Sequence, residues 1–185
     1  MTAVQIVVLL VALQRLAELA YARRNSRRLL AAGAREVGAG HYPLMVLLHA
    51  GWLLSILVLV PHDTPVSGWL LGLFLLLQAG RVWVIATLGR FWTTRIISIP
   101  DQPLVRSGPY RLCRHPNYVI VVAEIAVLPL AFGAWQIALL FSLLNGALLA
   151  WRIRVEEAAL AERLELAEVK LSVGPPDHTV EVSRF

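Results

Sequence analysis

The sequence predicts an all-α, polytopic integral membrane protein with about five transmembrane helices, the last two forming a C-terminal helical hairpin. Three observations predict this class. Apolar residues make up 58% of the 185 residues and charged residues 16%, against roughly 45–50% and 25% in soluble domains. The apolar residues gather in runs long enough to cross a bilayer core of ~30 Å. The basic residues collect at alternating ends of these runs.

Four apolar runs account for the five helices. Residues 2–22, 43–60 and 66–88 each predict one membrane crossing, because about 20 helical residues span the bilayer core. The run 119–151 is too long for one crossing and short for two, so a tight hairpin fits it best. Phe132-Gly133-Ala134 supplies the turn, since glycine tolerates the dihedral angles of a chain reversal.

A few ionisable residues lie inside the predicted spans, where they are costly and therefore candidates for function or for helix association. Arg15 and Glu18 are three residues apart on one helix and can pair, while Arg81 lies one turn from Gln78. We expect both sets to tie helices together. Glu124 has no partner nearby in sequence. It is expected either to pair with an arginine of the loop 89–118 or to face a substrate.

Lysine and arginine placement predicts the orientation. The segments 23–42, 89–118 and 152–185 each hold five of the 17 basic residues, and only Arg15 and Arg81 lie within spans. Because cytoplasmic flanks carry the basic excess, the amino terminus is expected outside and the carboxyl terminus in the cytoplasm. This topology explains the net charge of +5 without a nucleic-acid partner. The single cysteine allows no internal disulfide, and no cysteine or histidine pattern indicates a metal site.

The segment 104–118 is the most informative stretch outside the spans. Pro116 suits the first position of a helix, and we expect free backbone N–H groups at Asn117 and Tyr118. Arg111 and Arg114 lie beside this helix start. A helix start among arginines is an anion-binding environment.

The last span carries a polar stripe. Asn145, Arg152 and Glu156 fall within ~20° of one helix face. Glu157 adjoins Glu156, and neighbouring carboxylates at a helix end need cationic partners, which the loop 89–118 can supply. Beyond this stripe, apolar spacing from residue 160 to 171 predicts a C-terminal helix that Gly174-Pro175-Pro176 ends.

Together these residues resemble the C-terminal core of the isoprenylcysteine carboxyl methyltransferases and their bacterial relatives. The shared pattern is Leu104-Val105-x-x-Gly108-x-Tyr110, then Arg114-His115-Pro116-x-Tyr118, a helical hairpin, and Arg152-x-x-x-Glu156-Glu157. On this resemblance the chain is a single membrane domain, 1–185. It consists of three variable spans (1–88), a catalytic core (89–171) and a tail (172–185). The resemblance implies an integral membrane enzyme that takes S-adenosylmethionine from the cytoplasm and methylates an oxygen of a lipophilic acceptor.

The resemblance also implies site residues. Those that bind the cofactor would be Gln102, Pro103, Leu104, Val105, Tyr110, His115, Pro116, Asn117, Tyr118 and Glu156. Arg152 matches the position that orients the acceptor's carboxylate, and Glu124 is the second candidate catalytic residue. Methyl transfer by in-line displacement depends mainly on positioning. A carboxylate acceptor needs no base, whereas a phenol or enol would benefit from one, with Glu124, Glu156 and His115 as candidates.

The identity of the acceptor stays open. The segments 91–97 and 117–124 look more like bacterial members associated with alkylpyrone or alkylresorcinol methylation, which would methylate a hydroxyl. A branch that methylates phospholipid amines should prefer acidic contacts, so Arg152 disfavours it. The alternative from another class is a non-catalytic membrane protein, such as a small channel or assembly factor. The expected partners are membrane lipid and a lipophilic or prenylated acceptor, and the sequence leaves the oligomeric state open.

Overall fold

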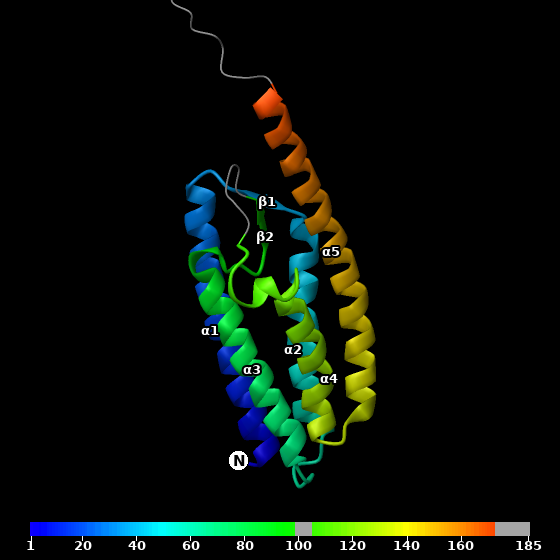
Figure 1. Ribbon diagram of the computed structural model, residues 1–185. Coiled ribbons are helices and arrows are strands. Elements are labelled where there is room, and N and C mark those ends of the chain that lie inside the picture. The colour runs from blue at the N-terminus through cyan, green and yellow to red at the C-terminus, as the bar shows by residue number, and fades with distance from the viewer. Residues whose placement is uncertain (99–104, 173–185) are drawn as a thin grey trace, which may run out of the picture.

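The structure is a computed structural model that describes residues 1–98 and 105–172, with side chains described except for His41 and residues 162–172. It is almost entirely helical, as Figure 1 shows, and it confirms the predicted all-α class. The α-helices are α1 (Ala3–Ala31), α2 (Tyr42–Leu59), α3 (Gly68–Leu88), α4 (Pro116–Ala131) and α5 (Trp135–Ser172).

The helices match the predicted spans closely. α1, α2, α3 and α5 are each long and apolar enough to cross a membrane, while α4 is a shorter apolar helix of 16 residues. α4 and α5 form the predicted hairpin, and the turn falls at residues 132–134. Gly133 adopts a φ of +68° there, a conformation that L side chains rarely adopt.

Two helices are longer than the spans they contain. α1 continues past residue 22 to Ala31, and α5 is one helix of 38 residues that includes both the last span and the helix predicted from 160 to 171. Hydropathy marked where the apolar residues end, but arginine, leucine and alanine continue a helix until a breaker intervenes. The first breaker after α1 is Gly33, and after Gly146 the next is Gly174. In Figure 1 the last part of α5 extends beyond the bundle. The predicted stop at Gly174-Pro175-Pro176 lies outside the described residues.

The sequence analysis missed a small antiparallel ribbon. β1 (Arg35–Val37) pairs with β2 (Ile96–Ser98), and short 3-10 helices lie at η1 (Ala39–His41), η2 (Gly89–Phe91) and η3 (Gly108–Arg111). Arg95 donates to both carboxylate oxygens of Glu36, over 3.0 and 2.7 Å. The ribbon joins the connection after α1 to the connection after α3, at the end of the bundle where α5 protrudes (Figure 1).

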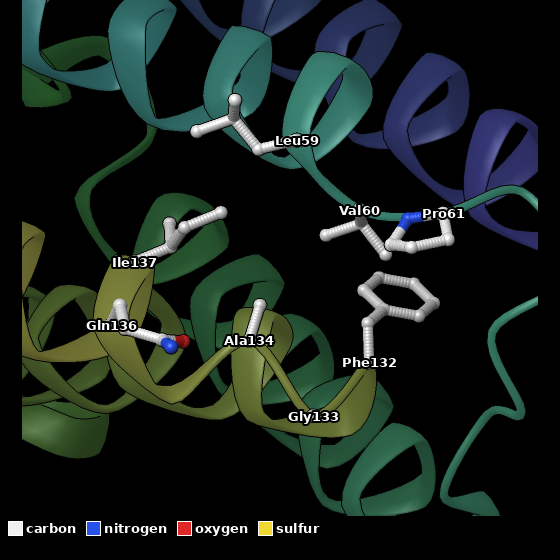
Figure 2. A pocket seen from close by; sticks show the side chains of 8 residues that line it. All are labelled: Leu59, Val60, Pro61, Phe132, Gly133, Ala134, Gln136 and Ile137. Carbon is white, nitrogen blue, oxygen red and sulfur yellow. The ribbon is translucent and has the colours of Figure 1, made fainter.

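The hairpin turn docks on the opposite end of the bundle. Figure 2 shows the side chain of Phe132 lying toward Val60 and Pro61, beside a cavity of about 350 Å³. Phe132 and Val60 are buried. The backbone N–H of Ser67 donates to the carbonyl oxygen of Ala131 over 2.8 Å, so the start of α3 is fixed to the same turn.

A buried ionic cluster joins α1, α3 and α4, and consists of Arg15, Glu18, Gln78, Arg81 and Glu124. The Glu124 carboxylate, 2% exposed, accepts two hydrogen bonds from Arg81, one of them from Nε over 3.0 Å. It also accepts from Arg15 over 2.8 Å and from Gln78 over 2.7 Å. Arg15 pairs with Glu18 at 2.8 Å, as expected. The arginine partners of Glu124 therefore come from α1 and α3, not from the loop 89–118.

Asn25 attaches α1 to α3 a second time, nearer the ribbon. This buried side chain, 2% exposed, donates to the carbonyl oxygens of Gly89 and Trp92 over 3.1 and 2.9 Å. Both carbonyls belong to the segment that follows α3. α1 is thus held to α3 at two separate levels of the bundle.

We predict that Glu124→Gln strongly destabilises the protein, because it leaves two buried arginines facing one carboxylate. Loss of one partner of a buried ion pair costs about 3–5 kcal/mol. The matched control is Glu36→Gln, which removes a partly exposed pair whose contribution is about 1 kcal/mol or less. Thermal denaturation in mild detergent should show a much larger fall in Tm for Glu124→Gln, and equal falls would contradict the structural role of the cluster.

Candidate active site

A cavity of about 390 Å³ lies within the helical bundle and is lined by residues from all five α-helices and from the segment 92–94. Its polar lining residues are Arg15, Glu18, Tyr42, His49, Arg81, Thr93, Thr94, Asn117, Tyr118 and Arg152. Its apolar lining residues are Ala12, Leu16, Leu19, Met45, Val46, Ala50, Leu53, Trp92, Val121 and Leu149. The cavity therefore offers both charged groups and hydrocarbon walls, which suits an amphiphilic ligand.

A chain of hydrogen bonds, Arg152–Tyr118–Glu156, links α4 to α5 at one end of the cavity. Arg152 Nε donates to the Tyr118 hydroxyl over 2.7 Å, and that hydroxyl donates to Glu156 Oε2 over 2.5 Å. Arg152 Nη1 donates to the carbonyl oxygen of Thr94 over 2.9 Å. Arg152 is 7% exposed, so these two bonds fix a buried guanidinium. Its Nη2 makes no hydrogen bond within the described part of the chain.

The start of α4 brings several predicted residues together. The His115 ring stacks on the Tyr118 ring, with centroids 5.1 Å apart and planes within 9° of parallel. Pro116 occupies the first position of α4, as predicted, and it is buried. The Tyr118 backbone N–H donates to the carbonyl oxygen of His115 over 3.0 Å. The expectation that this N–H is free is therefore wrong, because a tight first turn satisfies it.

Six buried side-chain atoms have no hydrogen-bond partner among residues 1–98 and 105–161, and two of them, His115 Nε2 and Asn117 Oδ1, lie at the start of α4. The others are Arg15 Nε, the Tyr42 hydroxyl, Trp92 Nε1 and Asn145 Oδ1. A buried polar atom left unpaired costs about 1–3 kcal/mol. A polar ligand at the start of α4 would complete the hydrogen bonds of His115 and Asn117.

The 3-10 helix η3 precedes α4 in the chain and packs on α3. Tyr110 packs against a small apolar cluster that contains Ala22, Val84 and Trp92. Burial, together with the nearby Glu156 carboxylate, raises the pKa of Tyr110 to about 12, so this residue is a neutral phenol at neutral pH. Gly108 adopts a φ of +55°, and a Cβ built on it would lie 2.6 Å from Thr87 Oγ1.

The structure gathers most of the predicted site residues and separates others. Those that meet at the start of α4 and on the facing part of α5 are His115, Pro116, Asn117, Tyr118, Arg152 and Glu156, with Tyr110 nearby. Val105 is half-buried, and Gln102, Pro103 and Leu104 lie outside the described residues. Glu124 does not line the cavity, since it belongs to the ionic cluster.

The carboxylate that follows Glu156 also finds a partner. Glu157 lies 3.9 Å from Arg114, as the need for cations from the loop 89–118 suggested, but both side chains are exposed. The described residues contain no group of three or more side chains that could hold a metal ion.

Sequence reasoning missed several polar residues of the cavity, including Tyr42, His49 and Thr94. Tyr42 and His49 are isolated polar residues of α2 without a motif, and the only available signal was the polar interruption that His49 makes in an apolar run. Thr94 contributes its backbone carbonyl oxygen, a group that no side-chain pattern reveals.

The fold and the cavity define an integral membrane protein with a polar site inside its helical bundle. The chain belongs to the isoprenylcysteine carboxyl methyltransferase (ICMT) family, whose family model matches residues 70–162. The matched region contains the hairpin, the Arg152–Tyr118–Glu156 chain, and two members of the ionic cluster, Arg81 and Glu124. This finding confirms the resemblance seen in the sequence and supports a methyltransferase activity.

Three bacterial proteins are similar to this chain. The uncharacterized protein YpbQ of Bacillus subtilis is 40% identical over 153 residues, covering 80% of this chain and 91% of that protein. An uncharacterized protein of Haemophilus influenzae is 28% identical over 145 residues, covering 75% and 83%. The cobalt-zinc-cadmium resistance protein CzcN of Cupriavidus metallidurans is 36% identical over 129 residues, covering 60% and 58%. No solved structure matches the chain.

We predict that Gly108→Ala destabilises the protein more than Gly133→Ala. Both glycines have positive φ, so each alanine incurs a backbone cost of about 1–2 kcal/mol. Only at Gly108 does the added Cβ also collide with Thr87, whereas nothing lies within 4 Å at Gly133. Thermal denaturation in detergent should give the larger fall in Tm for Gly108→Ala. Equal falls would contradict the close approach of η3 to α3.

Proposed function

We propose that the protein is an S-adenosylmethionine-dependent O-methyltransferase that methylates a lipophilic acceptor within the cavity. The observation that carries the proposal is the Arg152–Tyr118–Glu156 chain, which meets the cavity inside the family-matched region. The cofactor supplies a preactivated methyl group on a sulfonium. The residues of the chain then need only bind the cofactor and the acceptor, orient them, and exclude water from the site.

The residues at the start of α4 suit such a cofactor. Glu156 is half-buried and uses one oxygen for Tyr118, so it can accept further hydrogen bonds from hydroxyl or amine groups. The stacked rings of His115 and Tyr118 offer an aromatic surface, and the unpaired atoms of His115 and Asn117 offer polar contacts. We propose the same binding role for Gln102, Pro103, Leu104, Val105, Tyr110 and Pro116, on the family resemblance alone.

Arg152 is proposed to orient the acceptor oxygen. Its Nε and Nη1 donate to Tyr118 and Thr94, so the plane of the guanidinium is fixed. Arg152 lines the cavity, and its Nη2 can donate a hydrogen bond to a ligand there. A fixed cationic donor favours a carboxylate or a hydroxyl oxygen over an amine. This argument favours oxygen acceptors, whether a prenylcysteine carboxylate or the hydroxyl of an alkylpyrone or alkylresorcinol, over phospholipid amines.

Glu124 is proposed as a positioning residue. Its two oxygens already accept hydrogen bonds from two arginines and a glutamine, which stabilise the carboxylate and make it a poor proton acceptor. Two of those partners, Arg15 and Arg81, line the cavity, so Glu124 acts through them. If the acceptor is a hydroxyl, Glu156 and His115 are the remaining predicted bases.

We predict that S-adenosylhomocysteine binds the detergent-solubilised protein with micromolar affinity and that Glu156→Gln weakens binding at least about tenfold. A half-buried charged acceptor contributes about 1.5–3 kcal/mol to such contacts. Calorimetric titration measures the Kd, and Glu157→Gln is the matched control, since Glu157 is exposed and paired only at 3.9 Å. Absence of binding to the folded parent protein would contradict methyl transfer and favour the non-catalytic alternative.

We infer further that the ribbon end of the bundle, with Arg152 and Glu156, faces the cytoplasm. Support comes from the arginine-rich segments at that end and from the amino terminus at the other end, as seen in Figure 1.

Cys113 is exposed and is the single cysteine of the chain, so it tests this orientation directly. A membrane-impermeant maleimide should label Cys113 only after the cells are permeabilised. The matched variant is Asp63→Cys in a Cys113→Ser background, because residue 63 is exposed in the connection between α2 and α3. It should be labelled in intact spheroplasts. The reverse pattern would invert the topology.

A further inference from the structure

The inner part of the cavity carries polar groups to which the proposed methyl transfer assigns no ligand. Arg15 and Glu18 of α1, His49 of α2 and Arg81 of α3 line it, at a distance along the helices from the Arg152 end. A ligand that is only hydrocarbon there would leave Arg15 Nε and His49 Nε2 without hydrogen bonds, which is unfavourable in a buried site. The inner part therefore fits a ligand that places a second polar group beyond the one at Arg152.

His49 presents a hydrogen-bond acceptor. Its Nδ1 lies 2.8 Å from the carbonyl oxygen of Met45, one turn earlier in α2. A carbonyl oxygen only accepts, so Nδ1 carries the proton and Nε2 of the neutral ring has a lone pair. No residue of the described chain donates to Nε2. The ring also packs edge-on against Trp52, whose Nε1 donates to the carbonyl oxygen of Ile125 over 3.2 Å, so its orientation is set from both sides.

Arg15 presents a donor. Its Nη1 is bound by Glu18 and its Nη2 by Glu124, both at 2.8 Å. Its Nε is buried and unpaired within the described residues. The ionic cluster contains two arginines and two glutamates, so it is neutral overall. A neutral ligand group fits it better than a charged one, which would lack a counter-charge.

We propose that Arg15 and His49 form a subsite for a second, neutral hydroxyl group of the acceptor. A hydroxyl matches both sides, because its hydrogen is donated to His49 Nε2 while its oxygen accepts from Arg15 Nε–H. An ether or carbonyl oxygen satisfies Arg15 only, and a carboxylate adds unbalanced charge. The ligand's identity as acceptor rests on the proposed function. The subsite itself rests on the cavity and these two side chains.

The remaining walls indicate where the acceptor's tail lies. Leu16 of α1 and Val46 of α2 line the cavity, with 62% and 40% of their surface exposed. An amphiphile whose polar head occupies Arg15 and His49 would place its hydrocarbon tail along this apolar wall.

The test compares the binding of amphiphiles that share one hydrocarbon tail and differ only in the polar head group. We expect the full-length protein in detergent to bind pentadecylresorcinol, with two hydroxyls, about tenfold or more tightly than meta-pentadecylphenol, with one, by calorimetric titration. His49→Leu should bring the two affinities within about twofold, whereas His62→Leu, at an exposed position between α2 and α3, should leave the preference unchanged. Equal affinities in the parent, or a preference that survives His49→Leu, would overturn the subsite.

A second ligand tests the same proposal on the parent protein, in case His49→Leu does not fold. The dimethyl ether of pentadecylresorcinol keeps both oxygens and loses both hydroxyl donors, so in either orientation it leaves His49 Nε2 without a donor, and it should bind the parent protein about tenfold or more weakly than the diol. Binding as tight as that of the diol would overturn the subsite. S-adenosylhomocysteine titration of the same sample reports on the proposed function separately, because a diol preference without cofactor binding supports the subsite and contradicts methyl transfer.

Discussion

The bundle depends on one buried carboxylate. Glu124 lies where three helices meet, and its charge is what allows Arg15 and Arg81 to lie at membrane depth. Without that charge both guanidinium groups would be desolvated with only Glu18 to balance them. The same two arginines form part of the cavity wall, so the interaction that holds α1, α3 and α4 together also shapes the inner part of the site.

The two ends of the cavity differ in how they are built. At one end Arg152, Tyr118 and Glu156 form a linear chain between α4 and α5, and the backbone of Thr94 completes it. At the other end the ionic cluster connects α1, α3 and α4 through a compact set of pairs. The first end lies entirely within the family-matched region, whereas Arg15 and His49 belong to the spans that precede it. The helices that precede the matched region thus add Arg15 and His49 to a cavity whose other end the matched region builds.

Local sequence features predicted the parts of the structure that local features determine. Apolar runs located the spans, and Gly133 with its neighbours located the hairpin turn. The Arg15–Glu18 pair followed from a spacing of three residues on one helix. The ribbon, the insertion of Tyr118 between Arg152 and Glu156, and the role of His49 depend on contacts between segments far apart in the chain. Residue spacing does not predict such long-range contacts. The site residues were therefore predicted as one site only from the resemblance to a family.

The double attachment of α1 has a mechanical consequence. Asn25 fixes α1 to the segment after α3, and the ionic cluster fixes α1 to α3 itself, so side-chain bonds hold α1 at two levels of the bundle. Trp52 of α2 is bound in turn to the carbonyl oxygen of Ile125 in α4. Widening the inner cavity between these helices therefore requires at least one of these side-chain bonds to break.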